Sequence, residues 1–390
     1  MTAPLLAPPR LRLPSANRDR HATWLELFYD LVFSVAVAAL GSRLVEKPSL
    51  AGLLQMIALF VPVWWAWVGH TVYDTRFDND DLFQRLSTLG IMLGAAAMAV
   101  AIPFAFEGRA SLFATAYVIT RAFLLTMYVR AHIHVPEARK IIRLYLSGFC
   151  LGAGLWTLAI FLPAPWSYRL WLLGLAIDFV TPWLGLRILR SAPLDTTHVP
   201  ERFASFTIIV LGVLIAMIVS RVTGPHVQPV AYLAALFAFC LTVCVWWLYF
   251  TFLDVAPVDR TLGPGQPFIY VHLPLVLGLI ILGVALELVI GEAGRPHLSI
   301  GTRWFLGLGL VLWLLAGLAL KLVMTRHLHS LWLFVRIGLL ICAIMMLTVG
   351  ALLPPLVVLG TFVGLLVIFV GYEVQYLRKM AQQEEGGKRA

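Results

Sequence analysis

Two carboxylates interrupt an apolar stretch near the start of the chain. The stretch reads TWLELFYDLVFSVAV (residues 23–37), and Glu26 and Asp30 stand four residues apart in it. That spacing puts both on one face of a helix. A charged side chain within a bilayer helix costs roughly 2.5–3.5 kcal/mol on insertion scales, so it normally pairs or faces water. We predict a buried partner or polar cavity for Asp30, whereas Glu26 equally fits the first turn of a helix in the headgroup layer.

A second polar group follows in VWWAWVGHTVYDTRFDNDD (residues 63–81), where His70 and Asp74 are again four residues apart. Histidine titrates near neutral pH, so His70 is a candidate proton-responsive group, although it also fits a simple hydrogen-bonding role. A calcium loop counted from Asp74 would need Gly and Glu where Asn79 and Arg85 stand. No metal site is predicted here, and the acidic turn is expected to cap the next helix.

The acidic residues require basic partners within or beside the membrane. Arg85 begins a helix at the depth of Asp30, Arg20 and Arg76 lie near that depth, and Arg121 falls inside an apolar span. An intramembrane arginine is by default paired or water-facing. The predicted transport network is Glu26, Asp30, His70, Asp74, Arg85 and Arg121, with Asp178, Glu287 and Arg336 as secondary candidates.

The composition indicates that membrane helices position these residues. The chain has 390 residues, of which 61% are hydrophobic and 13% charged. Soluble domains are roughly 45–50% apolar and about 25% charged. The four cysteines lie in apolar runs and are expected to be buried and unpaired. The net charge of +9 is explained by positive residues retained on the cytoplasmic side rather than by nucleic-acid binding.

The hydropathy pattern predicts an all-α polytopic membrane protein with about twelve spans, each of roughly 20 residues. The predicted spans are 24–45, 50–75, 82–106, 110–131, 141–162, 167–190, 203–223, 229–254, 267–290, 301–323, 330–350 and 355–377. Residues 1–22 resemble no signal peptide and are expected to form a cytoplasmic tail, as are residues 379–390. Lys and Arg are concentrated in the loops that this layout places inside, so both termini are predicted to be cytoplasmic.

The chain contains an internal repeat. DRHATW (19–24) aligns with ERFASF (201–206), and TRAFL (120–124) aligns with TRWFL (302–306), at the same offset of 182 positions. The offset also aligns VWW at 63–65 with VWW at 245–247. We therefore predict two parallel six-helix repeats, residues 23–190 and 201–378, joined by a linker at 191–200. The acids are not repeated, because Glu26 aligns with Ile208 and Asp30 with Gly212.

Four segments resemble the low temperature requirement A family of bacterial membrane proteins. They are ATWLELFYDLVFSVAVAAL, VWWAWVGHTVYDTRFD…DDLFQR, HVPERF..FTIIVLG and YVHLPLVLGL, and they come from both halves of the chain. The resemblance implies a multi-pass protein of the bacterial inner membrane. The family name records a cold-growth phenotype and implies no activity. Family members often have Leu-Gly-Glu where this chain has Leu211-Gly212-Val213, so the resemblance supplies no acid in the second half.

A shorter likeness is to two-repeat potassium channels of lysosomes and bacteria, whose first helix has an Arg…Phe-Ser-Asp…Val-Phe-Ala pattern. Here Arg20 precedes Phe28-Tyr29-Asp30 and Val32-Phe33-Ser34. Such a likeness of fold does not by itself assign a function.

The leading interpretation is a channel or secondary transporter for cations or protons, without enzymatic activity, cofactor or metal. Its expected partners are the lipid bilayer and a small cation or proton, with no nucleic acid, and a homo-oligomer remains open. Two alternatives remain: a membrane sensor or assembly protein whose polar network is structural, and an intramembrane enzyme acting on lipid through His70 and Asp74.

Overall fold

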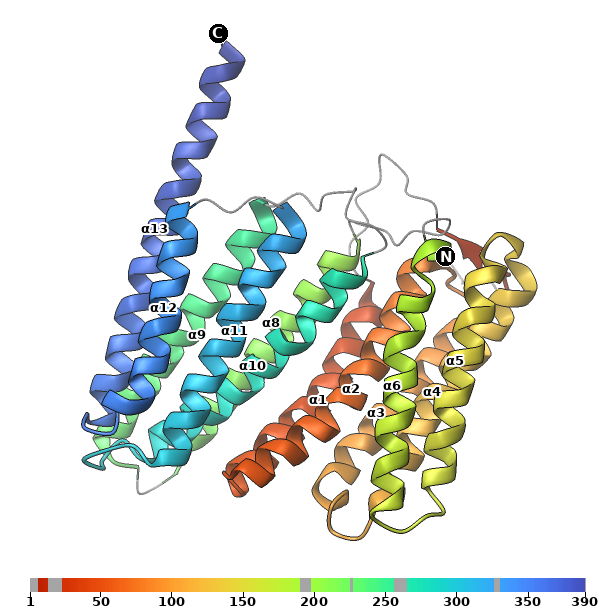
Figure 1. The fold of residues 1–390 in the computed structure, drawn as a ribbon, viewed down its shortest axis with the longest axis horizontal. Coiled ribbons are helices and arrows are strands. Elements are labelled where there is room, and N and C mark those ends of the chain that lie inside the picture. The colour runs from red at the N-terminus through yellow and green to blue at the C-terminus, as the bar shows by residue number, and fades with distance from the viewer. Residues whose placement is uncertain are drawn as a thin grey trace. The chain divides into compact units, whose positions relative to one another are not determined.

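The protein is helical almost throughout (Figure 1). The structure is a computed structural model that describes residues 6–12, 23–189, 198–224, 227–255, 265–325 and 330–389. Its α-helices are α1 (Trp24–Glu46), α2 (Leu50–Arg76), α3 (Leu82–Ala101), α4 (Ala110–His134), α5 (Arg139–Ala159), α6 (Trp166–Leu184), α7 (Leu186–Leu189), α8 (His198–Val222), α9 (Pro229–Val255), α10 (Gln266–Gly291), α11 (Ile300–Thr325), α12 (Ser330–Val349) and α13 (Pro355–Arg389). Short 3₁₀ turns at Ile102–Phe104 and Pro136–Ala138 follow α3 and precede α5.

The predicted class of all-α membrane protein is confirmed. Within the described ranges, ten helices are long and apolar enough to cross a bilayer. The predicted spans 167–190 and 330–350 also fall on helices, α6 and α12, but neither is among the ten. Arg169 and Asp178 lower the hydropathy of the 19-residue α6. The sequence of α12 is apolar along its 20 residues, and its described side chains give the segment Arg336–Val349.

Local sequence signals explain where the first helices begin. Thr23 caps α1 through a reciprocal pair of hydrogen bonds with Glu26, a capping box. Ser49 caps α2 by accepting from the Gly52 N–H, and Asp81 caps α3 by accepting from the Gln84 N–H. The acidic turn therefore caps α3, as predicted. Between α2 and α3, a two-residue strand β2 (Phe77–Asp78) pairs antiparallel with β1 (Arg10–Leu11).

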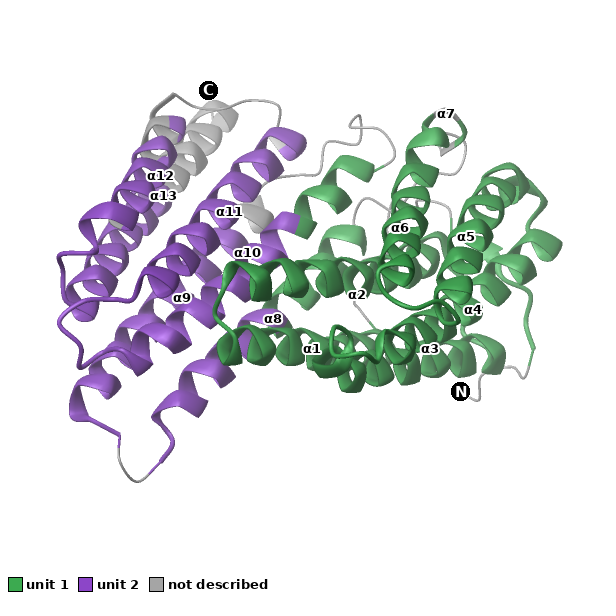
Figure 2. Ribbon diagram, turned by 60° about the horizontal axis from the view of Figure 1, so that its bottom comes forward, with its two compact units in different colours: residues 1–209, 258–273 green, residues 210–257, 274–390 purple. Residues whose placement is uncertain are grey.

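The chain divides into two compact units, coloured separately in Figure 2. Unit 1 comprises Met1–Ile209 and Val258–Leu273, so it includes α1 to α7 and the beginnings of α8 and α10. In it, α3 packs on α1 and α4, and α5 packs on α4 and α6. Aromatic stacking fixes several of these contacts. Trp156 stacks on Trp171 at 4.9 Å between ring centroids, and Trp67 stacks on Phe206 at 4.2 Å.

Unit 2 comprises Val210–Pro257 and Pro274–Ala390. In it, α13 packs on α9 and α12, and α11 packs on α12. Glycines bring α10 and α11 close together, because a Cβ added at Gly278 would lie 2.9 Å from the backbone nitrogen of Trp313. A Cβ at Gly309 would lie 2.7 Å from the backbone nitrogen of Leu282. Small residues permit such backbone approaches in membrane helices.

Gly309→Ala should therefore lower the free energy of unfolding by about 1–3 kcal/mol, since the added methyl group meets backbone that cannot move aside. The control is Gly364→Ala in α13, where an added Cβ meets nothing within 4 Å. Unfolding of both variants in detergent, followed by circular dichroism, provides the measurement. Equal stability of the two variants would contradict close α10–α11 packing.

Candidate functional site

Asp30 forms a buried ion pair with Arg202, which comes from the first turns of α8. Arg202 Nη1 and Nη2 donate to the two carboxylate oxygens at 3.0 and 2.9 Å. The indole nitrogen of Trp67 donates to the same carboxylate at 2.8 Å. Asp30 has no exposed surface and Arg202 is 1% exposed. The prediction of a buried partner is confirmed for Asp30.

Glu26 lies one helical turn before Asp30 and has two roles. Its carboxylate accepts a hydrogen bond from the Thr23 backbone N–H at 2.6 Å, which completes the capping box. Its other oxygen lies 3.2 Å from Nε2 of His198, and the side chain is buried. The helix-start interpretation of Glu26 is therefore right, and the residue also belongs to the buried polar site.

The two contacts form a ladder of charged and polar pairs between α1 and α8. Glu26 faces His198 and Asp30 faces Arg202, and both pairs are separated by 172 residues. The constant separation means that the two helices run parallel here, with matching four-residue steps. Sequence reasoning missed His198 and Arg202 as partners. One signal could have revealed them: HVPER places two basic residues four positions apart, the same spacing as that of the two acids.

His70 and Asp74 lie beside this ladder on α2 and are linked through α3. His70 Nε2 lies 3.0 Å from the Thr88 hydroxyl, and that hydroxyl donates to the Gln84 carbonyl at 2.9 Å. Which of the two atoms donates in the His70–Thr88 contact depends on the tautomer of His70. The Gln84 amide donates to Asp74 at 3.1 Å. The ring of Tyr29 stacks on His70 with a centroid distance of 4.5 Å.

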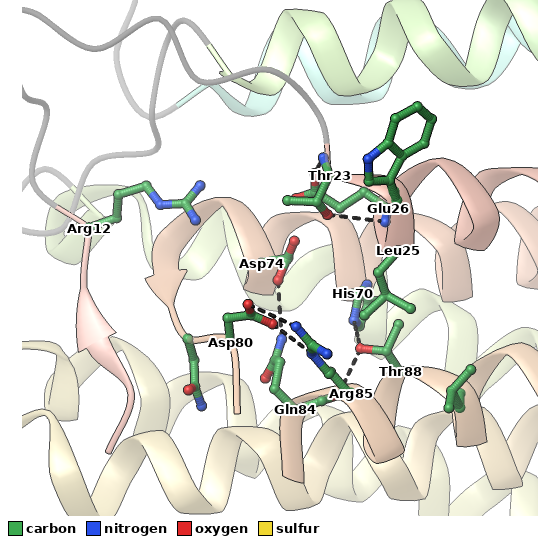
Figure 3. A pocket seen from close by; sticks show the side chains of 13 residues that line it. Arg12, Thr23, Leu25, Glu26, His70, Asp74, Asp80, Gln84, Arg85 and Thr88 are labelled. Carbon is green, nitrogen blue, oxygen red and sulfur yellow. Dashed lines mark hydrogen bonds and ion pairs between the residues drawn. The ribbon is translucent and has the colours of Figure 1, made fainter. Parts of the chain in front are cut away.

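A cavity of ≈ 450 Å³ lies among α1, α2, α3 and the N-terminal segment (Figure 3). Glu26, His70 and Asp74 line it together with the polar side chains of Gln84 and Thr88. The carboxyl groups of Glu26 and Asp74 thus face the same cavity and lie within electrostatic reach of one another. Five of the six predicted network residues lie at or beside this cavity, counting Arg85 in its lining and Asp30 next to Glu26.

The predicted partnership of Arg85 with the buried acids is wrong. Arg85 lines the cavity, but its side chain is 48% exposed and it forms a forked pair with Asp80 at 2.8 and 3.1 Å. Asp80 is close in sequence and also exposed, so Arg85 remains in water. Arg76, another predicted neighbour of Asp30, is not bonded to it, and Arg20 lies outside the described residues.

Arg121 belongs to a separate buried cluster. Its Nη2 lies 3.2 Å from the carboxylate of Asp178, and the Tyr117 hydroxyl donates to the same oxygen at 3.1 Å. The guanidinium also lies 4.7 Å from the ring centroid of Phe149. Arg121 thus contacts α5 and α6, and its guanidinium also lies close to Gly69 of α2, where an added Cβ would be 3.3 Å from Nη1. Arg121, a predicted network residue, is thus paired with Asp178, a secondary candidate. The predicted single network is therefore two separate clusters.

The other secondary candidates lie in unit 2. Glu287 is half-buried on α10, where it interacts electrostatically with Arg221. Arg336 is buried on α12, donates to the Leu314 carbonyl at 3.3 Å, and lies 5.5 Å from the ring centroid of Phe369. These residues form no part of the cavity beside α1.

The N-terminal segment is tied to the turn between α2 and α3. Arg130 donates to both oxygens of Asp81 at 3.0 and 2.5 Å and to the Ala7 carbonyl at 2.6 Å. Burial by itself would raise the pKa of the Asp81 carboxyl, but hydrogen bonds from Arg130, Gln84 and Ala7 hold its pKa below the usual value. Asp81 therefore stays ionised and fastens the segment that lies next to the cavity.

Comparison with known proteins agrees with these features. The family model of the bacterial low temperature requirement A protein matches residues 21–371. The chain belongs to the low temperature requirement A family. An uncharacterized protein of Rhizobium meliloti (strain 1021) is 26% identical over 325 residues, which cover 75% of this chain and 79% of that protein. The family assignment drawn from the sequence motifs is therefore confirmed, and the match includes α1 and the start of α8.

The Asp30–Arg202 pair should couple strongly in this low temperature requirement A protein. Asp30→Asn or Arg202→Gln alone should each destabilise it by about 3–5 kcal/mol, because either change leaves a buried charge unpaired. The double variant removes both charges and should be more stable than the sum of the single changes indicates. Unfolding midpoints in detergent measure the coupling, and strictly additive effects would contradict the pair.

Asp81→Asn should destabilise the protein in a pH-dependent way. The folded pKa of Asp81 is lowered, so its stabilising effect is complete above the unfolded value of about 3.9 and disappears as pH falls through the folded value. The difference in melting temperature between wild type and variant should therefore stay constant from pH 7 to about pH 4 and shrink as the pH falls further toward pH 3. The exposed Asp80→Asn is the control, with a small difference at every pH. A gap for Asp81→Asn that does not change with pH would disprove the assignment.

Proposed function

We propose that this low temperature requirement A protein moves protons or small cations across the membrane, as a channel or secondary transporter. The observation that supports this proposal is the ≈ 450 Å³ cavity at one end of α1. The carboxyl groups of Glu26 and Asp74 and the side chain of His70 line it. Intramembrane ionisable residues that face a cavity typically mark an ion or proton pathway. The proposal involves transport without catalysis, a cofactor or a resident metal.

A chain of titratable groups supports proton movement in particular. Glu201 is partly exposed and lies 3.5 Å from Nδ1 of His198. The opposite nitrogen of that ring lies 3.2 Å from Glu26, which shares the lining of the cavity with Asp74. An imidazole that contacts a carboxylate at each nitrogen can accept a proton on one side and release one on the other.

The Asp30–Arg202 pair is the barrier in this proposal. It lies one turn beyond Glu26, is fully buried, and uses both carboxylate oxygens. An arginine fixed in this way repels a cation at the end of the cavity, and a protonated or cation-bound Asp30 would no longer hold it. Passage thus requires that this pair separates.

The proposal includes the predicted internal repeat and the twelve predicted spans. At the offset of 182, α1 to α6 overlap α8 to α13 in order. The ends of α2 and α9 agree within three residues, whereas α1, α4, α5 and α6 are displaced from their counterparts by six residues or more. The proposed arrangement is two parallel six-helix repeats in the bacterial inner membrane, with both termini in the cytoplasm. The pathway would then follow α1 and its counterpart α8, whose first turns already contact each other through the ladder.

Flux measurements with purified protein in liposomes test the proposal. Glu26→Gln and Asp74→Asn should each reduce proton, K⁺ or Na⁺ flux by more than about tenfold, which corresponds to roughly 1.4 kcal/mol in the barrier. Glu107→Gln is the matched control, because Glu107 is an exposed acid paired with Arg43 and Lys47 and distant from the cavity lining.

Absence of proton, K⁺ and Na⁺ flux in wild-type protein would overturn the proposal. If Asp30→Asn only lowered the melting temperature and changed no flux, the polar ladder would have the structural role expected of a membrane sensor or assembly protein.

A further inference from the structure

The lining of the cavity beside α1 contains oxygen acceptors from three helices (Figure 3). The carboxylates belong to Glu26 on α1 and Asp74 on α2, and the amide oxygen belongs to Gln84 on α3. Gln84 is 4% exposed, and its amide nitrogen donates to Asp74 at 3.1 Å. Its Oε1 has no donor in the described part of the chain. Buried acceptors normally receive a hydrogen bond, so this set favours a ligand that brings donors of its own.

The charges around the cavity favour a cation beside the carboxylates of α1 and α2. Both arginines of the lining are engaged with other acids. Arg85 pairs with Asp80 at 2.8 Å. Arg12 Nη2 lies 3.3 Å from Asp78. The two carboxylates of α1 and α2 repel one another when both are ionised, and a cation between them offsets that repulsion.

The cavity is much larger than a single inorganic ion requires. Its volume of ≈ 450 Å³ falls within the roughly 300–1,000 Å³ that is typical of small-molecule sites. One water molecule, by comparison, occupies about 30 Å³ of the liquid. Trp24, Leu25 and Leu89 add apolar surface to the lining. An organic cation with a short hydrocarbon body would bury that body against them.

The imidazole of His70 favours a cation that carries N–H groups. His70 is 2% exposed, lines the cavity, and has no partner for Nδ1 in the described part of the chain. In the tautomer with its hydrogen on Nε2, Nδ1 is an acceptor. A nitrogen acceptor suits an N–H donor, whereas hard metal cations take oxygen ligands. A primary ammonium group has three N–H donors in a compact positive charge, which matches the acceptors of the lining.

We propose that this cavity binds a small protonated primary amine. The ammonium group donates to Glu26, Asp74 and Gln84, and the hydrocarbon body lies against Trp24 and Leu25. This inference rests on the proposed cation pathway and names the class of cation that enters it. A quaternary ammonium ion has the same charge but no N–H, so it leaves the buried acceptors unsatisfied and binds more weakly.

Isothermal titration calorimetry of the purified full-length protein at neutral pH, with n-butylammonium chloride, tests the site. Tetramethylammonium chloride and potassium chloride are the comparison salts, at the same ionic strength. The variants are Asp74→Asn, which removes the charge and keeps the shape, and Gln84→Met, which removes the amide oxygen. The control is Glu107→Gln, since Glu107 is an exposed acid outside the cavity lining.

Wild type and Glu107→Gln should bind n-butylammonium more tightly than either comparison cation by about tenfold or more, because only the amine brings N–H donors. Asp74→Asn and Gln84→Met should each weaken amine binding by about tenfold, the effect of losing one hydrogen bond to a charged group. Equal affinity of wild type for the three cations would overturn the inference, as would amine binding that neither variant changes. If a variant does not fold, the wild-type comparison of the three cations still decides.

Failure of this inference and failure of the transport proposal give different results. Proton, K⁺ or Na⁺ flux in liposomes without amine binding would refute the amine site and leave transport in place. Amine binding without any flux, that of the amine included, would support the site and refute transport.

Discussion

The ladder between α1 and the start of α8 is the constraint on which the polar interior of unit 1 depends. Asp30 and Arg202 neutralise each other across two hydrogen bonds, and Glu26 meets His198 one turn away. Either charge alone would be costly to bury, so the two helices must meet in one register. Trp67 then donates to Asp30 and packs against Phe203 and Phe206, which joins α2 to the same point.

This register also determines where water can enter. The paired Asp30 and Arg202 fill the space between α1 and α8, whereas Glu26 and Asp74, nearer the helix ends, border a cavity. One acidic face therefore has a closed part and an open part a single turn apart. A site that binds and releases protons or cations needs such a difference, because an ion must meet a barrier as well as a binding group.

The buried arginines of unit 1 illustrate three ways of placing a guanidinium in a helical membrane protein. Arg202 is neutralised by an acid of a distant helix, Arg121 by Asp178 together with the ring of Phe149, and Arg76 by no described side chain. The first arrangement fixes helix register and the second fixes α4 against α6. The third places the guanidinium over the ring of Tyr145, with Cζ 5.5 Å from the ring centroid.

The sequence by itself determined the class, the family and most helix positions, because apolar runs of about 20 residues and capping residues such as Thr23 and Asp81 act locally. It also singled out Glu26 and Asp30 as residues that need partners. Only the tertiary structure decided which partners they have. Arg202 lies 172 residues from Asp30, while Arg85, much nearer in sequence, pairs with exposed Asp80. Spacing reveals which face of a helix a charge occupies, but ion pairing depends on which helix covers that face, and that is set by packing across the whole chain.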